Sequence, residues 1–215
     1  MKDSTPKEQI LSKVRNALIE KTDNPYHENE YSGEVLRITD PTEEAEVSFA
    51  RELITAGGNF IYCENERSFI EYLNELILER DWTAIWCQSE KINNLLSVGE
   101  IPHYKNQPAE NEKIVGLTTC EKLISRTGTI LVSDIDCGSR STFSFPDIHL
   151  VMAYSSQVTD TLKTAFSDLK IKYPEKLPPQ ITAITGPSRT ADIEKTLVKG
   201  AHGPKELYVF MIDDL

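Results

Sequence analysis

Short apolar runs alternate with segments of helical periodicity from about residue 33 onward. Runs of about four to eight apolar and β-branched residues are typical of strands, whereas apolar residues three and four positions apart are typical of helices. The sequence predicts strands at 34–39, 59–63, 83–87, 113–117, 129–133, 149–153, 180–185 and 206–212. It predicts helices between several of them, at 42–56, 66–80, 90–97, 155–169 and 189–199.

This alternation predicts an α/β domain with a mostly parallel sheet and helices on both of its faces. The runs at 130–132 and 207–212 are apolar throughout. Such runs are typical of central parallel strands, which are buried on both faces. The expected architecture is therefore a three-layer α/β/α fold.

The N-terminal residues follow a different pattern. Thr5 followed by Pro6 predicts the start of a helix, because threonine caps helices and proline is favoured at the first helical position. Residues 22–33 are polar and contain proline and glycine, which indicates a linker. We predict an N-terminal helix and linker at 1–32 and an α/β domain at 33–215.

Composition narrows the classes of partner. The chain has 215 residues, 27% of them charged, and a formal net charge of -11. Nucleic-acid-binding proteins present a basic face to phosphates, so a nucleic-acid partner is not expected. No apolar run approaches the roughly 20 residues of a membrane-spanning helix. The charged N-terminus lacks the apolar stretch of a secretion signal, so a cytoplasmic protein is expected.

The four cysteines, Cys63, Cys87, Cys120 and Cys137, lie far apart in the sequence. Metal and cluster sites usually take their ligands from closely spaced cysteine pairs, so we expect no metal or iron–sulfur site within this chain. Cys63 and Cys87 end apolar strands and are expected in the core. Cys137 follows in a polar segment, which makes it the one candidate for reactivity; a plain free thiol is the simpler interpretation.

The strongest candidate for a binding site lies at 181–207. There a predicted strand ends at Thr185, and the helix predicted over 189–199 follows it. The N–H groups at a helix N-terminus attract anions, and neighbouring hydroxyl and guanidinium groups would complete a site for a carboxylate or phosphate. An ordinary helix cap without a ligand is the alternative. The candidate ligand-binding residues in this segment are Gly186, Ser188, Arg189 and Thr190.

His202 lies near the far end of the same predicted helix. At a rise of about 1.5 Å per residue, Ser188 and His202 would be roughly 18 Å apart. A nucleophile and its base need about 3 Å, so a Ser–His pair within the chain is not expected. Capping of carbonyls, packing of a turn and contact with another subunit stay open for His202. Solvated or structural roles are expected for His27, His103 and His149.

A second candidate segment contains a Thr-Gly-Thr sequence at 127–129. Glycine there supplies a positive φ or lets a ligand approach the backbone, and a turn between two short strands is the favoured interpretation over a helix-to-strand loop. A Gly-Ser-Arg sequence follows at 138–140; it would hold an anion or form a hydrated loop. The candidate residues here are Thr127, Gly128, Thr129 and Arg140.

Two of these runs resemble the lactate utilisation protein C, or LUD-domain, family. The sequence Thr-Gly-Pro-Ser-Arg-Thr-Ala-Asp-Ile-Glu, with the later Gly-Ala-His-Gly-Pro-Lys-Glu-Leu, spans 185–207 and is similar to the C-terminal signature of the family. The sequence Thr-Gly-Thr-Ile-Leu-Val at 127–132 is similar to a second family motif. The family usually has an acidic residue before that motif, where this chain has Arg126. This difference argues against a carboxylate acting at the loop.

The resemblance implies the fold of the ribose-phosphate isomerase, glucosamine-phosphate deaminase and CoA-transferase group. It also implies a role in converting L-lactate to pyruvate beside two partner proteins, at least one of which carries iron–sulfur clusters. The anion at Ser188–Thr190 would then be lactate, pyruvate or a phosphorylated cofactor. The resemblance assigns no catalytic residue, so whether this chain is itself an enzyme stays open. A homo-oligomer is among the open assembly states.

Two other functions stay open from the sequence. The first is a non-catalytic assembly or regulatory subunit that uses the N-terminal helix and the turn at His202 as contact surfaces. The second is a stand-alone enzyme acting on a sugar phosphate or CoA ester, which rests on fold-level analogy alone.

Overall fold

A computed structural model describes residues 5–19, 43–108, 113–135, 137–191, 197–199 and 203–214. The chain divides into two units, Met1–Arg37 and Ile38–Leu215. The predicted boundary between residues 32 and 33 and the predicted strand at 34–39 lie outside the described residues.

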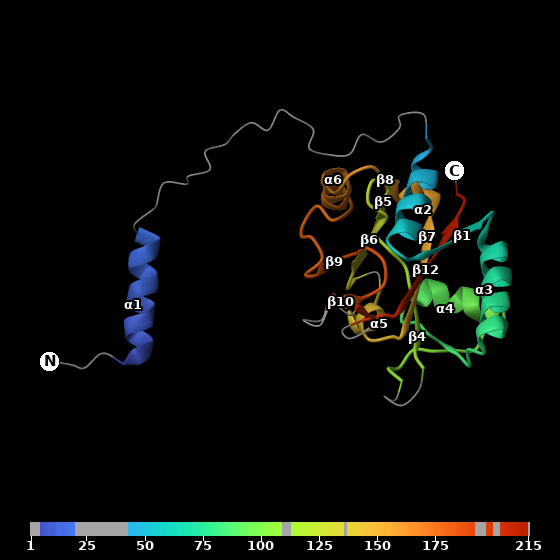
Figure 1. Cartoon of the computed structure of the whole chain (residues 1–215), viewed down its shortest axis with the longest axis horizontal. Helices are drawn as coiled ribbons and strands as arrows, with labels where there is room; N and C mark the ends of the chain where they lie inside the picture. Colours follow the sequence, from blue (N-terminus) through green and yellow to red (C-terminus); the bar gives the residue numbers. More distant parts are fainter. Residues whose placement is uncertain are drawn as a thin grey trace. The chain divides into compact units, whose positions relative to one another are not determined.

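The first unit contains α1 (Pro6–Ile19), which begins at the proline expected at the first helical position (Figure 1). A reciprocal pair of hydrogen bonds caps this helix. The backbone N–H of Glu8 donates to the Thr5 hydroxyl at 3.4 Å, and the N–H of Thr5 donates to the Glu8 carboxylate at 2.8 Å. The local sequence therefore accounts for the start of α1.

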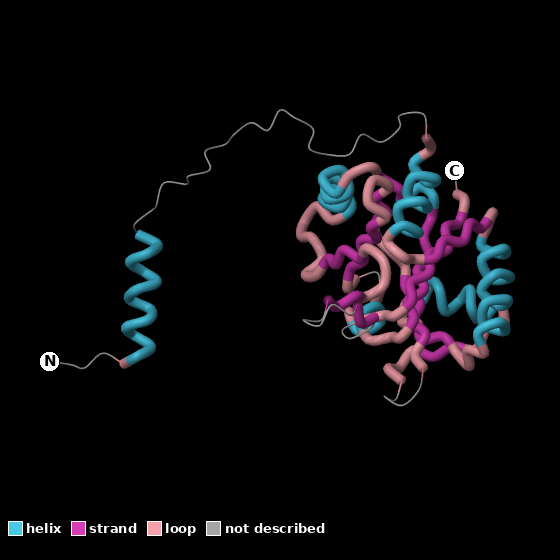
Figure 2. The backbone as a smooth tube through the Cα atoms, in the orientation of Figure 1, coloured by secondary structure: helices cyan, strands magenta, loops and turns pink. Residues whose placement is uncertain are grey.

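The second unit is built around a six-stranded sheet in which every pairing is parallel (Figure 2). From one edge to the other, its strands are β1 (Asn59–Cys63), β12 (Glu206–Ile212), β7 (Ile148–Tyr154), β4 (Val115–Thr118), β2 (Ile85–Trp86) and β3 (His103–Tyr104). The central strands β7 and β12 are buried along almost their whole length, as their apolar sequences predict.

Helices cover one face of this sheet. They are α3 (Glu66–Arg80) and α4 (Glu90–Val98), and Figure 1 shows both on the same side of the strands. The rings of Phe69 on α3 and Phe210 on β12 pack edge to face, with centroids 5.2 Å apart. Asn65 caps α3 by accepting from the N–H of Ser68 at 3.0 Å, which explains why this helix has the predicted bounds.

The other face is covered by α2 (Ala45–Thr55) and by a second sheet of four strands (Figure 1). The strands of the second sheet, in order, are β8 (Val158–Thr159), β5 (Lys122–Ile124), β6 (Thr129–Ser133) and β9 (Ile181–Ile184). One apolar core, including Phe49 of α2 and Val209 of β12, fills the space between the two sheets. α6 (Leu162–Lys172) packs on the second sheet through Ala165 and Leu169. The α/β/α prediction is confirmed.

Two further elements are short: a 3-10 turn at Ser155–Gln157 and α5 (Ser141–Ser144). The helix predicted at 155–169 is therefore only partly right. α6 begins later, after Thr161, whose hydroxyl accepts from the N–H of Thr164 at 3.2 Å. None of the helices in the described residues is long and apolar enough to cross a membrane.

The helix predicted over 189–199 is wrong. Arg189–Ala191 forms β10, Leu197–Lys199 forms β11, and the two strands pair antiparallel with Arg189 opposite Lys199. The predicted strands on either side of this segment also do not belong to one sheet, because β9 is in the second sheet and β12 is in the first. Apolar residues four positions apart over so short a stretch do not determine a helix when the chain can form strand pairs instead.

Candidate functional site

The two candidate segments meet in the second sheet. β6 pairs antiparallel with β9, which brings the Thr-Gly-Thr sequence beside the end of the strand before Gly186. The Thr129 and Thr185 hydroxyl oxygens are 2.7 Å apart, and that of Thr127 is 2.7 Å from that of Thr129. β5 and β6 are joined by the turn that contains Gly128, so the predicted turn between two short strands is confirmed.

Two glycines let these loops pack against the C-terminal end of α2. Gly128 has a φ of +61°, and a Cβ there would lie 2.3 Å from the backbone nitrogen of Leu53. Gly186 has a φ of +75°, and its Cβ would lie 2.4 Å from the carbonyl oxygen of Ala56. Because side-chain-bearing residues avoid positive φ and these contacts are with backbone, glycine is required at both positions.

Arg189 lies at the same end of α2. Its Nη2 donates a hydrogen bond to the carbonyl oxygen of Ala56 at 2.8 Å, while the side chain as a whole is exposed. The last carbonyls of a helix carry a partial negative charge, which stabilises a cation there. Arg189 is thus positioned by the C-terminus of a helix, and not by the helix N-terminus that the sequence predicted. A guanidinium has five N–H donors, and this bond uses one of them.

A cavity of about 360 Å³ lies beside Arg189, between the second sheet and the amino ends of β7 and β12. Among the described residues that line it, Arg189 is the only charged one. We call this cavity the Arg189 pocket. Its described lining residues are Phe143, Ser144, His149, Thr182, Ala183, Ile184, Thr185, Gly186, Pro187, Ser188, Arg189, Gly203, Pro204 and Leu207. The N–H of Ser188 donates to the carbonyl of Pro204 at 2.8 Å, which ties the two loops of the wall together.

One wall residue, His149, was not a candidate from the sequence. It has no exposed surface, so of the two roles expected for it, solvated or structural, burial excludes the solvated one. Its Nε2 lies 2.8 Å from the Thr118 hydroxyl, and its Nδ1 has no hydrogen-bond partner among the described residues. Burial lowers the pKa of His149 to about 3, so the ring is neutral near pH 7. A histidine inside an otherwise apolar strand was the signal available in the sequence.

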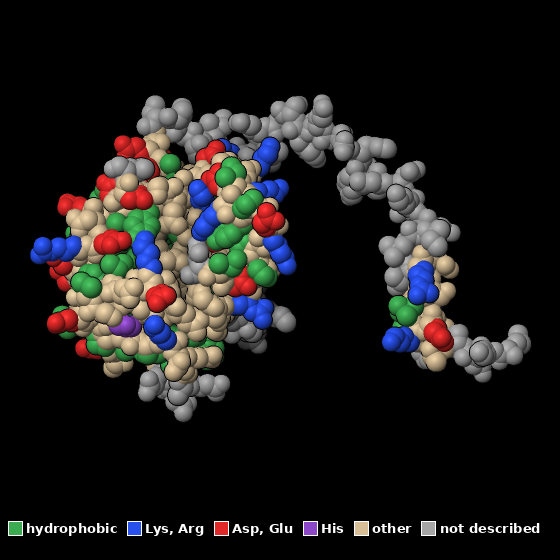
Figure 3. Space-filling model, turned by 180° about the vertical axis from the view of Figure 1, so that it is seen from behind, with side chains coloured by type: hydrophobic (Ala, Val, Ile, Leu, Met, Phe, Trp, Pro, Cys, Tyr) green, Lys and Arg blue, Asp and Glu red, His purple; other side chains and the backbone are tan. Residues whose placement is uncertain are grey.

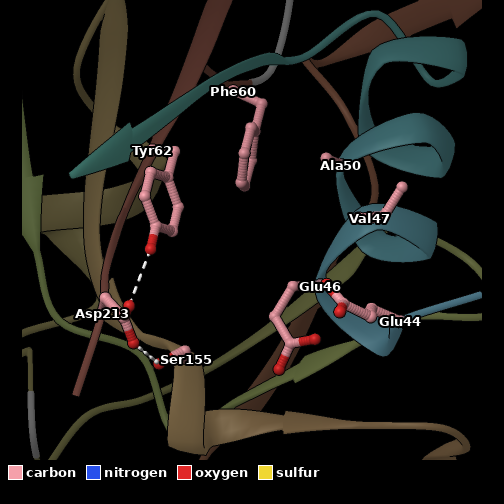
Figure 4. Close-up of a pocket in the computed structure, with 8 residues that line it drawn as sticks. All are labelled: Glu44, Glu46, Val47, Ala50, Phe60, Tyr62, Ser155 and Asp213. Carbon is pink, nitrogen blue, oxygen red and sulfur yellow. Dashed lines mark hydrogen bonds between the residues drawn. The ribbon is translucent and has the colours of Figure 1, made fainter. Parts of the chain in front are cut away.

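A larger cavity of about 670 Å³ lies between α2 and the carboxyl ends of β1 and β12. Figure 4 shows the rings of Phe60 and Tyr62 facing Val47, with carboxylates at one end. The Tyr62 hydroxyl donates to Asp213 at 2.7 Å, and this bond raises the pKa of Tyr62. We call this the acidic cavity, because the charged side chains among its described lining residues are those of Glu44, Glu46 and Asp213. Such a set repels an anion.

A third cavity, of about 370 Å³, lies beyond the carboxyl ends of β2, β4 and β7. Ligands of parallel α/β sheets usually bind at these ends, so by its position this cavity is a second candidate for an anion site. Its cation, Lys91, donates to the Tyr154 hydroxyl at 2.8 Å, and Tyr154 donates to Glu66 at 2.5 Å. The carboxylate of Glu66 thus offsets the charge of Lys91. Of the three cavities, the Arg189 pocket is the one best suited to an anion.

The other candidate ligand-binding residues from the sequence lie in the pocket wall, in β10 and next to α5. Gly186, Ser188 and Arg189 line the pocket. Thr190 lies in β10, where only its backbone is described. Arg140 is at the start of α5 and its side chain is not part of the pocket wall, although its carbonyl accepts from the N–H of Ser144 at 3.2 Å.

The four cysteines are all buried. Burial raises the pKa of Cys63 and of Cys87 to about 12, which confirms them as core residues. Cys137 is also buried, and its Sγ donates to the carbonyl of Thr119 at 3.3 Å, so its polar sequence surroundings did not indicate an accessible thiol. In the described parts of the chain, no three His, Cys, Asp or Glu residues are grouped so as to hold a metal ion.

Basic and acidic side chains are intermixed on the surface of the second unit that Figure 3 shows. A basic face of the kind that binds nucleic acid is not present on this view of the described residues.

Comparison with known proteins bears on both motif segments. Residues 111–212 match the LUD domain family. The matched range includes the Thr-Gly-Thr turn and every residue that lines the Arg189 pocket, whereas most of the acidic cavity lies outside it. The resemblance of these segments to the LUD-domain family is confirmed.

Several similar proteins are named lactate utilization protein C. The protein from Deinococcus radiodurans is 34% identical over 97 residues, which is 45% of each chain. The protein from Geobacillus thermodenitrificans is 27% identical over 76% of this chain and 67% of its own length. The protein from Bacillus subtilis is 30% identical over 74% of this chain and 64% of its own length. This chain thus spans between about half and two thirds of the length of these relatives.

A solved structure shares the fold. The crystal structure of a DUF162 family protein from Deinococcus radiodurans superposes with a TM-score of 0.59, covering 78% of this chain and 96% of that chain. The sequence identity is 17%, so the likeness shows the common fold alone.

Proposed function

We propose that this protein is a component of an L-lactate utilisation system and that it binds a small carboxylate, lactate or pyruvate, in the Arg189 pocket. The relatives named lactate utilization protein C support the metabolic role. One observation carries the ligand class: among the described residues of the pocket wall, Arg189 has the only charged side chain. A guanidinium pairs with a carboxylate through two parallel N–H···O bonds.

The net charge of -11 does not prevent this binding. Salt screens charges beyond about 8 Å at physiological ionic strength, so the groups nearest the ligand dominate. At the pocket these groups are the Arg189 guanidinium, the Ser188 hydroxyl and neutral backbone around Gly186. Thr127, Gly128 and Thr129 support the wall through the contact with Thr185.

The size of the pocket also favours a small acid. Small-molecule sites enclose roughly 300–1,000 Å³, and the Arg189 pocket, at about 360 Å³, is at the lower end of that range. A ligand of three carbon atoms fits this volume better than a CoA ester.

Conversion of lactate to pyruvate also releases two electrons. We assign these electrons to partner proteins that carry iron–sulfur clusters, on the strength of the family resemblance.

Calorimetric titration with L-lactate and with pyruvate tests this proposal. Wild type should be compared with Arg189→Gln and with Arg67→Gln, a control that removes an exposed arginine paired with Glu71 on α3. Loss of a charge-assisted pair weakens binding by about 1.5–3 kcal/mol, or about 10- to 150-fold. We expect that loss in Arg189→Gln only. Equal affinities in all three proteins would overturn the site assignment.

A second candidate function is a non-catalytic assembly subunit. It is favoured by α1, where Ile10 is 62% exposed and Leu11 is 42% exposed, since exposed apolar side chains on a helix commonly mark a contact surface. Recovery of iron–sulfur partner proteins should be compared for the full chain and for a chain lacking residues 1–30. Undiminished recovery without these residues would remove α1 from this function.

A further inference from the structure

A carboxylate bound at Arg189 leaves one feature of the pocket wall unexplained, which is the unpartnered Nδ1 of His149. The side chain has no exposed surface, yet it belongs to the pocket wall. Buried polar atoms nearly always have a hydrogen-bond partner, and an unmet one destabilises the fold. Nδ1 has no partner among the described residues, so a ligand atom is a natural candidate for that position.

The contact that Nε2 makes on the other side of the ring allows Nδ1 to be either a hydrogen-bond donor or an acceptor. Nε2 lies 2.8 Å from the Thr118 hydroxyl, and a hydroxyl can either donate or accept. When Thr118 donates to Nε2, the ring proton is on Nδ1, which then donates. When Nε2 donates to Thr118, Nδ1 carries a lone pair and accepts. Rotation of one hydroxyl therefore accompanies the exchange between the two neutral tautomers.

We propose that Nδ1 of His149 binds the oxygen on the second carbon of a 2-hydroxy or 2-oxo acid whose carboxylate faces Arg189. This inference rests on the proposed function, because it takes the carboxylate position from it. Nδ1 accepts from the hydroxyl of a 2-hydroxy acid and donates to the carbonyl of a 2-oxo acid. One pocket thus recognises both members of a 2-hydroxy/2-oxo pair, and it discriminates against acids without that oxygen.

Burial is consistent with this role. It keeps the ring neutral near pH 7, and only the neutral ring can serve as an acceptor at Nδ1. Phe143, which is 4% exposed, also lines the pocket, and its ring centroid is 6.4 Å from that of His149. Because His149 has no exposed surface, a ligand oxygen reaches Nδ1 only if the pocket wall moves.

The test compares L-lactate, pyruvate and propionate, which has the same carboxylate and no oxygen on its second carbon. In wild type we expect lactate and pyruvate to bind about tenfold more tightly than propionate, as loss of one buried hydrogen bond predicts. In His149→Phe, which keeps a ring of similar shape, the affinities for all three acids should become equal, with propionate unchanged. Equal binding of the three acids by wild type, or an equal loss of all three in His149→Phe, would overturn the inference.

A measurement on wild type alone covers the case in which His149→Phe does not fold. Nitrogen-15 NMR of the histidine rings should show a change at Nδ1 of His149 at saturating pyruvate and at saturating lactate, with the proton on Nδ1 only for pyruvate. Unchanged His149 signals with a ligand bound would overturn the role of His149 while leaving the Arg189 site in place. Binding of none of the acids would overturn the proposed function, and this inference with it.

Discussion

The hydroxyl groups of Thr129 and Thr185 lie 2.7 Å apart, although the two residues are separated by 56 positions in the chain. The contact joins the Thr-Gly-Thr turn to the loop that carries Ser188 and Arg189. It exists because β6 and β9 pair antiparallel, with Ile130 opposite Ile184. The two motifs that the sequence singles out are therefore parts of one structure beside one pocket.

A double-mutant cycle on this contact measures how strongly the two motifs are coupled. A hydrogen bond of this kind contributes about 1 kcal/mol net, so Thr129→Val and Thr185→Val should each lower the free energy of unfolding by about that amount. The double variant should lose less than the sum, by about 0.5–1.5 kcal/mol. Urea unfolding provides the values. Strict additivity would mean that the two hydroxyls do not act together.

Gly128→Ala should destabilise the protein far more than Gly57→Ala. Both glycines have a positive φ, +61° and +90°, so both substitutions strain the backbone by about 1–3 kcal/mol. The new Cβ at 128 would also meet the backbone of Leu53 at 2.3 Å, whereas that at 57 would meet only the end of the Arg189 side chain, which can move. We expect a loss of about 3 kcal/mol or more for Gly128→Ala. Similar unfolding midpoints for the two variants would show that the packing of the turn on α2 is not tight.

The pH dependence of stability should report the burial of His149. The pKa is lowered from 6.5 to about 3, so between these values the unfolded state binds a proton that the folded state does not. Stability is then complete above about pH 6.5 and falls as the pH decreases toward 3. From pH 7 to pH 5 this residue should account for about 2 kcal/mol of lost stability.

Denaturant unfolding of wild type and His149→Phe at both pH values isolates this contribution, because other titrating groups are common to the two proteins. The variant should lose less stability on acidification than wild type does. Parallel pH profiles for the two proteins would show that His149 is accessible to protons in the folded state.

Much of the fold follows from local sequence. The helix predicted at 66–80 from its helical periodicity agrees with α3, and the structure adds that Asn65 caps it. The core strands β7 and β12 were predicted because a continuous apolar run has few alternatives in an α/β chain. In these elements the local preference and the tertiary environment agree.

The hairpin of β10 and β11 shows where local sequence was insufficient. Ser188, Arg189 and Thr190 follow a glycine and a proline, which is also the pattern of a capped helix start. Strand pairing of Arg189 with Lys199 decides the outcome, and it depends on residues outside the local window. The prediction that Arg189 belongs to a site was made for a helix N-terminus, which the structure does not have at this position, so the Arg189 pocket is proposed on a different structural basis.

The contact of Arg189 with Ala56 and the position of His149 could not be predicted either. Both depend on how segments distant in the sequence pack, since α2 and β4 supply the partners of residues in the C-terminal half. His149 lies in an otherwise apolar strand, but the sequence could not place it in the wall of a pocket.

Mapping the ligand on the wild-type protein tests most directly whether a small carboxylate binds in the Arg189 pocket. Backbone amide signals should be followed by NMR as pyruvate is added to saturation. If pyruvate binds in the Arg189 pocket, we expect the largest shifts at Thr185, Ser188 and Gly203 of that pocket, with little change at Val47 and Tyr62 of the acidic cavity. Largest shifts around the acidic cavity, or none anywhere at saturating pyruvate, would contradict it.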